Sequence, residues 1–319
     1  MGTSSDLLLK GRKMTLVEKV QKYGLIGSAR MASHLVSHKL RHSKLGRSYS
    51  EWYFRNTPQY ANPTPDELCQ IETDLRALGI EMADYAPDPA LFQQFKTGAW
   101  FPPNYHGGEA SGVWDEKLLE HWISGDLLGL WHWGQDDIYV DIAACNSPWA
   151  QVLHERLGLS TFAIDLGPVG PSYCHLPYYR SENATQTTFQ DSSIAGASLQ
   201  CAYEMFVGDD DQRLIPELAR ILKPGGKAII LPLYMHTHYC AYSTPEYFGK
   251  GYPDADAQEY VRLDCSGVPS SRKYDAQHLK DRVLRPLEQV GMGYHLRILR
   301  NKHELGQNIY CHFILEIQK

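Results

Sequence analysis

Length, composition and charge restrict this chain of 319 residues to a few classes of protein. Hydrophobic residues make up 43% of the chain and charged residues 21%, and no apolar run approaches the roughly 18 residues that a membrane span requires. A net charge of −6 provides no concentrated basic surface for nucleic acid or anionic lipid, so the composition favours a small-molecule substrate. A homodimer is compatible with it.

Cysteine usage favours a reducing compartment. The seven cysteines are odd in number and contain no C-x-x-C pair, which disfavours a disulfide framework and a cysteine-based zinc site. The start of the chain has only three consecutive leucines and therefore no apolar core of a signal peptide. We expect a cytoplasmic protein.

Residues 1–113 are predicted to form a helical N-terminal extension that covers the substrate. Apolar residues recur at helical spacing between residues 15 and 42. On that helix His34, His38 and His42 share one face, as zinc-binding histidines can. Because cations lie nearby and no carboxylate does, a solvated or packed face is favoured over a metal site.

The remainder of the extension is punctuated by turns. The proline-rich segment 56–66 precedes a predicted helix that Asp66 can cap, and a turn-rich stretch follows over residues 87–112. A helix over residues 114–124 then leads toward the first strand of the second part, residues 114–319.

From Ile138 onward strands alternate with helices, which predicts an α/β fold with a mainly parallel sheet. The predicted strands are 138–143, 160–165, 194–201, 227–234, 293–300 and 308–317, and the predicted helices are 148–157, 211–222 and 275–290. Because residues 302–307 are too few for a parallel crossover, the last strand must be antiparallel to its predecessor. Its alternating apolar residues, from Ile309 to Ile317, predict one dry face.

One long stretch carries a family resemblance. Residues 217–233, E-L-A-R-I-L-K-P-G-G-K-A-I-I-L-P-L, resemble the helix, K-P-G-G turn and fifth strand of class I S-adenosylmethionine-dependent methyltransferases. The phrases E-K-L-L-E-H and F-V-G-D-D-D-Q-R-L-I-P-E-L are similar to methyltransferases encoded among polysaccharide and secondary-metabolite genes. The resemblance covers roughly residues 114–319 and implies a Rossmann-like, doubly wound sheet of seven strands that ends in an antiparallel hairpin strand.

The resemblance implies S-adenosylmethionine as the cofactor and assigns residues to it. Asp141 ends the first strand at the methionine end, and Asp165, which is 165 − 141 = 24 residues later, is expected to accept hydrogen bonds from both ribose hydroxyls. Asn183 precedes Ala184 where the family usually has an acidic residue, and its side-chain carbonyl can accept the amino hydrogen of adenine. Gln200 lies at the end of the predicted strand 194–201, which matches the family's fourth strand, facing the sulfonium.

The loop after the first strand contains no glycine, although the chain should approach its ligand there. Since S-adenosylmethionine carries no phosphate, Ala143 can replace glycine if its backbone angles are allowed. Ser147 is the predicted N-cap of the next helix and Pro148 its first residue. Asn146 forms either a structural Asx turn or a direct cofactor contact.

Methyl transfer from a sulfonium is an in-line displacement, so the site aligns the nucleophile, the methyl group and the sulfur, and removes a proton from the acceptor. In the related enzymes, the loops after the family's fourth and fifth strands lie at that point. In this chain they follow the predicted strands 194–201 and 227–234. We therefore expect Tyr203, Glu204 and His236 as candidate catalytic groups. Tyr178, from an aromatic connector that either lines a pocket or packs, and Asn146 complete the set.

Two further segments receive predictions. Residues 240–274 are rich in Tyr, Pro and Gly and long enough to form a lid. The acidic run of residues 208–212 precedes a helix, where negative charge stabilises the N-terminal dipole, so helix capping is favoured over magnesium binding. No metal site is predicted.

Three functions remain open. The leading one is a methyltransferase that acts on a hydroxyl or amine of a sugar or specialised metabolite. The second is a cyclase, similar to azetidine-2-carboxylate synthases, in which the amino group of S-adenosylmethionine attacks and methylthioadenosine leaves; an extension over the cleft and the cluster of Asn146, Tyr178, Tyr179 and Tyr203 would favour it. The third is a non-catalytic cofactor-binding protein, because the glycine motif is degraded.

Overall fold

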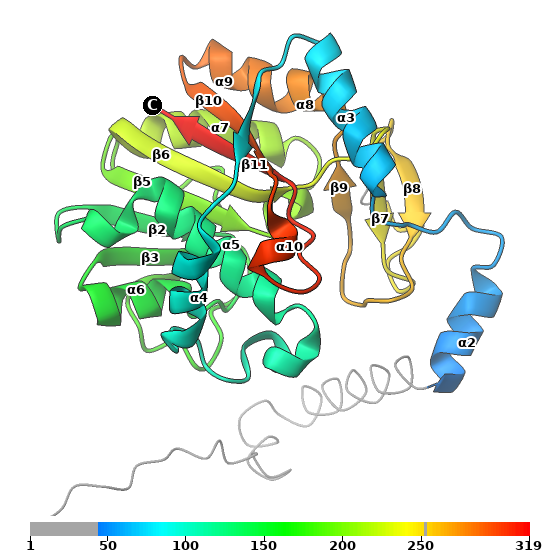
Figure 1. The fold of residues 1–319 in the computed structure, drawn as a ribbon, viewed down its shortest axis with the longest axis horizontal. Coiled ribbons are helices and arrows are strands. Elements are labelled where there is room, and N and C mark those ends of the chain that lie inside the picture. Colours follow the sequence, from blue (N-terminus) through cyan, green and yellow to red (C-terminus); the bar gives the residue numbers. More distant parts are fainter. Residues whose placement is uncertain (1–43, 252–253) are drawn as a thin grey trace, which may run out of the picture. The chain divides into compact units, whose positions relative to one another are not determined.

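The computed structural model describes residues 44–251 and 254–319, and the chain divides into two compact units, residues 1–57 and 58–319 (Figure 1). In the first unit the described element is the helix α2 (Lys44–Tyr53). The predicted helix between residues 15 and 42, with its three histidines, lies outside the described residues.

An eight-stranded sheet runs through the unit of residues 58–319, in the order β1-β10-β11-β6-β5-β2-β3-β4. Its strands are β1 (Met82–Tyr85), β2 (Ile138–Ile142), β3 (Ser160–Asp165), β4 (Tyr179–Ser181), β5 (Ile194–Gln200), β6 (Leu222–Leu233), β10 (Gly293–Leu299) and β11 (Phe313–Gln318). Neighbours pair in parallel, except that β11 is antiparallel to both β10 and β6. The predicted Rossmann-like sheet with an antiparallel C-terminal hairpin is confirmed.

The eighth strand, β1, corrects the predicted number of seven. It adds to the edge of the sheet parallel to β10 and is held there by Arg300, whose guanidinium contacts Asp84 and Glu72 at 2.7 Å each. Four residues are too few to show a strand period, so no sequence pattern indicated this strand. Residues 58–113, predicted as part of an extension, thus share one compact unit with the sheet; a substrate-covering role of the extension stays a prediction.

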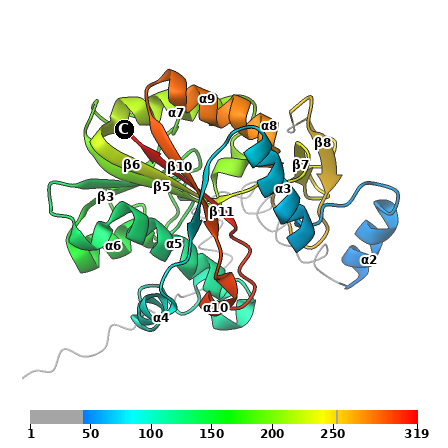
Figure 2. The ribbon, with the colours of Figure 1, turned by 45° about the horizontal axis from the view of Figure 1, so that its top comes forward.

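Helices cover both faces of the sheet (Figure 2). They are α3 (Pro65–Ala77), α4 (Pro89–Thr97), α5 (Trp114–Leu128), α6 (Trp149–Leu157), α7 (Asp210–Ile221), α8 (Ala276–Leu279), α9 (Arg285–Gln289) and α10 (Lys302–Leu305). A π turn, Lys280–Leu284, joins α8 to α9 within the predicted helix 275–290. In the described part of the chain, no helix combines the length and the apolar character needed to cross a membrane.

Two hydrophobic cores follow from the alternation of side chains along the strands. Val140 of β2 and Ile230 of β6 belong to one core with residues of α3, α7, α8 and α9. Their neighbours Tyr139 and Ile229 belong to the other core, with residues of α4, α5 and α6. Since successive strand residues point to opposite faces, a sheet buried on both sides needs apolar residues at nearly every position.

β11 shows the same effect and corrects the prediction of one dry face. It lies between β10 and β6, and all of its residues except Gln318 are buried, so both of its faces are covered. Glu316 on the expected wet face is only 2% exposed and pairs with Lys227 at 2.7 Å and Arg297 at 2.6 Å. The carboxylate is therefore buried as part of an ion pair network rather than solvated.

The K-P-G-G turn lies inside β6. Ile194 of β5 pairs with Leu222, but Gly196, two residues later, pairs with Lys227, so residues 223–226 bulge out of the ladder. Gly225 at this bulge has a φ of 78°, in the left-handed region that glycine adopts without a steric cost. The family-like motif therefore shifts the register of a central strand.

Two helix caps test the predicted starts. Thr64, rather than Asp66, caps α3, because its hydroxyl accepts the Glu67 backbone N–H and the Glu67 carboxylate accepts the Thr64 N–H in return. Asp275 caps α8 as predicted and accepts the N–H of His278 at 2.7 Å.

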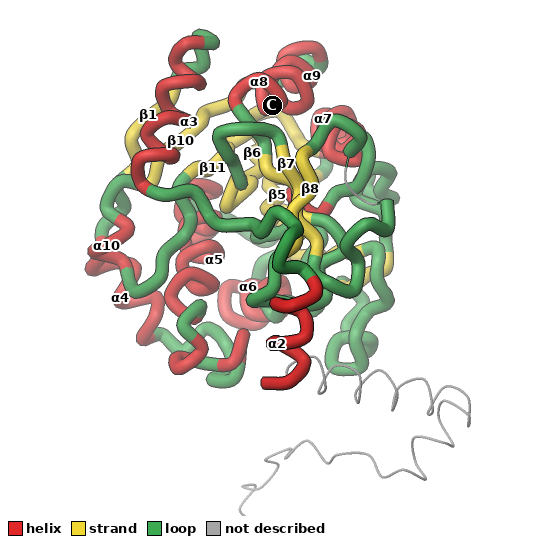
Figure 3. Tube along the Cα trace, turned by 90° about the vertical axis from the view of Figure 1, so that its right-hand side faces the viewer, coloured by secondary structure: helices red, strands yellow, loops and turns green. Residues whose placement is uncertain are grey.

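The segment predicted as a lid forms a second sheet of three strands, β7 (Cys240–Ser243), β8 (Gln258–Val261) and β9 (Ser271–Lys273), in the order β8-β7-β9 (Figure 3). β7 is parallel to β8 and antiparallel to β9. Its residues Cys240, Ala241 and Ser243 are buried, so this insertion has a packed interior of its own.

The acidic run before α7 anchors this second sheet. Asp211 is fully buried and pairs with Arg272 at 3.0 Å and Arg282 at 2.8 Å, while the Tyr274 hydroxyl donates to it at 2.7 Å. The helix cap itself, Asp209, makes no side-chain capping hydrogen bond. The acidic residues of segment 208–212 therefore act more through ion pairs with other elements than through capping of α7.

Candidate functional site

Two neighbouring pockets lie at the carboxyl ends of β2, β3, β4 and β5, where parallel α/β sheets bind ligands. They share Ala143, Cys145 and Cys201. The first pocket is completed by residues that follow β3, β4 and β5, among them Asp165, Leu166, Asn183, Ala184, Met205 and Phe206. The second is completed by α5, the segment before it and the loop after β2, including Tyr105, Lys117, Glu120, His121, Asp141, Asn146 and Gln200.

The loop after β2 reaches its shape without glycine by placing two other residues in left-handed backbone conformations. Ala143 has a φ of 55° and Cys145 a φ of 52°. The Cys145 N–H, turned by this geometry, donates to Asp165 Oδ2 at 2.8 Å. Non-glycine residues pay a steric penalty of about 1 kcal/mol or more there, which indicates that the loop shape is imposed by the surrounding structure.

The predicted start of the following helix is one residue too early. α6 begins at Trp149 with Pro148 as its cap, and Pro148 has no N–H and makes no side-chain cap. Ser147 still contributes, because its hydroxyl accepts the Trp149 N–H at 3.2 Å. The helix terminus thus remains satisfied beside the second pocket.

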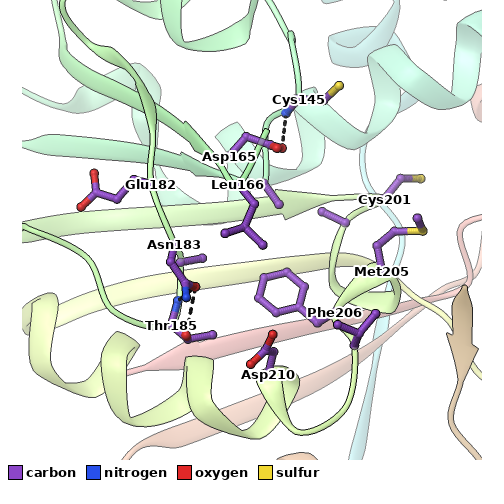
Figure 4. Close-up of a pocket in the computed structure, with 14 residues that line it drawn as sticks. Cys145, Asp165, Leu166, Glu182, Asn183, Thr185, Cys201, Met205, Phe206 and Asp210 are labelled. Atoms are coloured by element: carbon purple, nitrogen blue, oxygen red, sulfur yellow. Dashed lines mark hydrogen bonds between the residues drawn. The ribbon is translucent and has the colours of Figure 1, made fainter. Parts of the chain in front are cut away.

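Asp165 lies at the mouth of the first pocket with both carboxylate oxygens oriented by the backbone. Oδ2 accepts the Cys145 N–H, as Figure 4 shows, and Oδ1 accepts the Gly167 N–H at 2.7 Å. Each carboxylate oxygen has a second lone pair, so both can accept a further hydrogen bond. The group is held in place for a ligand with two adjacent hydroxyls.

The far end of the first pocket is apolar, with one polar loop. Leu166 is 72% exposed, and Figure 4 shows it and Phe206 projecting into the same cavity. Asn183 Oδ1 accepts both the backbone N–H and the hydroxyl of Thr185 at 2.9 Å, so this carbonyl is engaged within its own loop. A flat ring bound in this pocket can contact the amide nitrogen of Asn183 and the buried Ala184 beside it.

Asp141 is the distinctive group of the second pocket. Its carboxyl is 1% exposed, and Oδ2 has no hydrogen-bond partner. Burial raises the pKa of this carboxyl from its ordinary value of 3.8 to about 8. A buried oxygen without a partner is costly, and a ligand ammonium would satisfy it.

Gln200 closes the same pocket but is already anchored. Its side-chain nitrogen donates to Ser124 Oγ at 2.9 Å and to Ser198 Oγ at 2.6 Å. These bonds fix the amide at the end of β5 and leave its carbonyl oxygen for another donor.

Several residues of the second pocket come from α5 and were missed from the sequence. Lys117 and His121 are one turn apart, so they share a helix face, and both line the pocket with Glu120. Lys117 Nζ contacts Glu120 Oε1 at 3.0 Å and Cys201 Sγ at 2.8 Å. In the sequence, the spacing of Lys117, Glu120 and His121 in W-D-E-K-L-L-E-H-W was the pattern that could have indicated this shared helix face. The lining of this pocket therefore includes a cation as well as the carboxyl of Asp141, which suits a ligand that carries both an ammonium and a carboxylate.

The two pockets meet at Cys201. This residue directly follows β5 and has a φ of 48°, and its sulfur is surrounded by polar groups. Sγ lies 3.0 Å from Glu120 Oε1, 3.1 Å from the Tyr234 hydroxyl and 3.5 Å from the Tyr310 hydroxyl. A ligand that fills both pockets must pass this junction.

Two predicted catalytic residues lie away from the pockets. The Tyr203 hydroxyl donates to the Asp211 carbonyl at 3.0 Å inside the core, because the short helical turn after β5 directs this side chain inward. Tyr178 packs its ring against His154, with centroids 4.9 Å apart. Neither residue lines the first or the second pocket.

The other three predicted catalytic residues have different surroundings. Glu204 is buried, its Oε2 lacks a partner, and burial raises its pKa, but it lines neither pocket. His236 also lines neither. Asn146 does line the second pocket, and its Oδ1 accepts the Gly170 N–H at 2.8 Å. It thus ties two loops together, as a structural role requires, and keeps its amide nitrogen available.

Comparison with known proteins gives a family match for the part of the chain that builds these pockets. Residues 140–230 match a family described as a methyltransferase domain. No curated protein matched the chain in sequence.

Solved structures that are similar to the chain include three methyltransferases. A 1,6-didemethyltoxoflavin N1-methyltransferase from Burkholderia thailandensis, solved with its substrate and S-adenosylhomocysteine, is 11% identical and has a TM-score of 0.43, covering 82% of this chain and 93% of its own. A geranyl diphosphate C-methyltransferase from Streptomyces coelicolor is 14% identical with a TM-score of 0.38, and the match covers 80% of this chain and 98% of that protein. An S-adenosylmethionine-dependent methyltransferase from Mesorhizobium loti is 13% identical with a TM-score of 0.41, and the match covers 63% of this chain and 98% of that protein.

The pockets fit the cofactor of this family. The ammonium of S-adenosylmethionine would satisfy the unpartnered oxygen of Asp141, its ribose hydroxyls would meet the oriented carboxylate of Asp165, and its adenine would enter the apolar end beside Phe206. The strand order and the match of residues 140–230 to a methyltransferase domain show a methyltransferase fold, and the donor set of the two pockets fits S-adenosylmethionine as its cofactor.

Proposed function

We propose that this methyltransferase transfers the methyl group to a hydroxyl or an amine of a small molecule, such as a sugar or a specialised metabolite. The observation that carries the proposal is the polar setting of Cys201, which both pockets share: its sulfur contacts the Glu120 carboxylate, which lines the second pocket, and the hydroxyls of Tyr234 and Tyr310, which line neither. A polar acceptor can be hydrogen-bonded there. The net charge of −6 also favours a small molecule over a nucleic acid.

The cofactor is oriented by charge in this proposal. Asp141 pairs with its ammonium and Lys117 with its carboxylate in the second pocket, while Asp165 holds the ribose in the first. The sulfonium lies between the amino-acid part and the ribose of the cofactor, and therefore falls at the junction of the pockets. Its methyl group then faces the polar groups around Cys201.

The reaction needs alignment and the removal of one proton. The acceptor oxygen or nitrogen forms a bond to the methyl carbon, the bond from carbon to sulfur breaks, and its electron pair stays on sulfur to give S-adenosylhomocysteine. We assign the acceptor proton to Glu120, a carboxylate that is 1% exposed and reaches the junction. Lys117 at 3.0 Å and Tyr310 at 3.3 Å hold this carboxylate in place.

A product assay separates the proposal from its alternatives. The protein is incubated with labelled S-adenosylmethionine, with and without pools of small molecules that carry hydroxyls or amines. We expect S-adenosylhomocysteine and a labelled product only when an acceptor is present. Methylthioadenosine formed without any acceptor would establish cyclisation and overturn the proposal, and the absence of turnover with every pool would favour a binding protein.

The role of Glu120 has its own test. Glu120→Gln keeps the shape of the side chain but removes the base, so kcat should fall by roughly 10²- to 10⁴-fold while the KM for the cofactor changes little. Glu155→Gln on the exposed side of α6 is the matched control and should leave both values unchanged. An unaltered kcat in Glu120→Gln would exclude Glu120 as the base.

A further inference from the structure

A second cluster of reactive side chains lies outside the cofactor pockets, on the segment that leads from β6 into β7. His236, His238 and Cys240 alternate along this segment, and one ligand atom from each lies within 4.8 Å of the other two. Within the described ranges, this is the group of three or more His, Cys, Asp or Glu residues arranged closely enough to share an ion. The methyl-transfer proposal uses none of the three.

We propose that His236, His238 and Cys240 bind a zinc ion with one coordination position left open. Two imidazole nitrogens and one thiolate form a borderline-soft donor set that Zn²⁺ prefers, and three protein ligands with an open fourth position are typical of reactive zinc sites. Tetrahedral bonds of about 2.0–2.3 Å put ligand atoms about 3.5 Å apart. The present separations of up to 4.8 Å close to that value when the side chains rotate toward a common ion.

The ring nitrogens indicate how the histidines would coordinate. The Nε2 atom of His238 is hydrogen-bonded to the Tyr260 hydroxyl at 2.8 Å, which orients the ring and leaves Nδ1 as the ligand. Such a partner on the far nitrogen is a regular feature of zinc-bound histidine. Tyr260 would therefore be a positioning residue for the site.

The two Nδ1 atoms converge on one polar position. Thr237 Oγ1 lies 3.3 Å from Nδ1 of both His236 and His238. The Thr237 backbone N–H also donates to His236 Nδ1 at 3.0 Å. Zinc binding replaces the hydrogen bonds that these nitrogens form with Thr237 by coordinate bonds.

The third ligand lies in the interior. Cys240 is fully buried, and in the pairing of β7 with β9 it lies opposite Lys273. The carboxylate of Glu67 interacts electrostatically with both histidines, which adds negative charge next to a bound cation. His236 is 9% exposed, so the site is shielded without being sealed.

No metal site is predicted from the sequence, because the chain has no C-x-x-C pair and the histidines one helical turn apart have no carboxylate nearby. The pattern H-T-H-Y-C places its ligands at every second residue, which brings side chains to one side of an extended segment rather than of a helix. An ion here would fasten the end of β6 to the first strand of the three-stranded sheet.

The test loads the full chain with zinc, removes excess metal by gel filtration and measures bound metal by mass spectrometry. We expect one zinc per chain in the wild type and loss of stoichiometric zinc in Cys240→Ser and in His238→Ala. The matched controls Cys174→Ser and His175→Ala change exposed residues of the same types and should keep one zinc. Tyr260→Phe should weaken zinc binding by about tenfold.

Cobalt substitution in the wild type provides a readout that does not depend on the folding of any variant. Co²⁺ bound by a thiolate should give a sulfur-to-cobalt charge-transfer band together with intense visible bands of tetrahedral geometry. A wild-type chain that takes up neither zinc nor cobalt, or a cobalt spectrum without the thiolate band, would overturn the proposal. Zinc lost equally from the two control variants would overturn it as well.

Discussion

Cys145 shows at the scale of one residue how this site departs from a glycine-rich loop. Its backbone is left-handed with a φ of 52°, its side chain is exposed, and its N–H donates to Asp165. The conformation is thus needed for the carboxylate, while the side chain contributes little packing. Strain at this position comes from the Cβ atom alone.

Replacing this residue by glycine should therefore stabilise the fold. We predict that Cys145→Gly raises the free energy of unfolding by about 1 kcal/mol. Cys69, equally exposed but inside α3, is the matched control, and Cys69→Gly should lower it by about 1 kcal/mol because glycine disfavours a helix interior. Urea denaturation measures both, and a loss of stability in both variants would show that the loop is unstrained.

The buried carboxyl of Asp141 makes cofactor affinity depend on pH. Its pKa of about 8 in the free protein means that it is mostly protonated at pH 6 to 7, whereas pairing with an ammonium requires the carboxylate. Affinity for S-adenosylhomocysteine, whose amine is charged in this range, should rise about tenfold per pH unit from 6 to 7.5. Calorimetry should find this slope in the wild type and a flat, weak profile in Asp141→Asn; a flat wild-type profile would place the amine elsewhere.

The sequence located the residues that sit at the ends of strands but not those that arrive from other elements. Asp141 and Asp165 were identified because a strand end fixes where the next side chain lies. Lys117 and Glu120 come from a helix that precedes the sheet, so only the fold shows that they reach the pocket. Tyr203 was misplaced because the direction of one short helical turn decides whether its ring enters the pocket or the core.

At the scale of elements, Asp211 connects α7 with the three-stranded sheet and the helix after it. Its carboxylate pairs with Arg272 and Arg282 and is fully buried. Asp211→Asn should lower the free energy of unfolding by about 3–5 kcal/mol, because both guanidinium groups lose their shared buried partner. Asp209→Asn, two residues earlier and exposed, should change it by less than about 0.5 kcal/mol. Equal, small effects in thermal or urea unfolding would show that the network carries little stability.

Element predictions succeeded where local patterns were long and failed where a partner decided the outcome. The strands from Ile138 to Leu233 and the final hairpin follow from runs of apolar residues and short connections. β1 has only four residues and exists because β10 and Arg300 hold it. β11 was expected to have a wet face, but its central place in the sheet buries Glu316 with two cations.

At the scale of the whole molecule, every residue that lines the two cofactor pockets lies in the unit of residues 58–319. A chain that lacks residues 1–57 should therefore bind S-adenosylhomocysteine within about twofold of the full-length affinity. Loss of turnover with retained cofactor binding would support the substrate-covering role predicted for the extension. Loss of cofactor binding, with a circular dichroism spectrum that shows an intact fold, would mean that the first unit completes the cofactor site.

The proposed cofactor site and the proposed methyl transfer both depend on one ligand that spans the two pockets, with its ribose on Asp165. Calorimetric titration of S-adenosylhomocysteine into wild type, Asp165→Ala and the exposed control Asp136→Ala tests this most directly. We predict that Asp165→Ala weakens binding by about 1–3 kcal/mol, the value of hydrogen bonds to a charged group, while Asp136→Ala binds like the wild type. Unchanged affinity in Asp165→Ala would contradict the account and remove this carboxylate from the cofactor site.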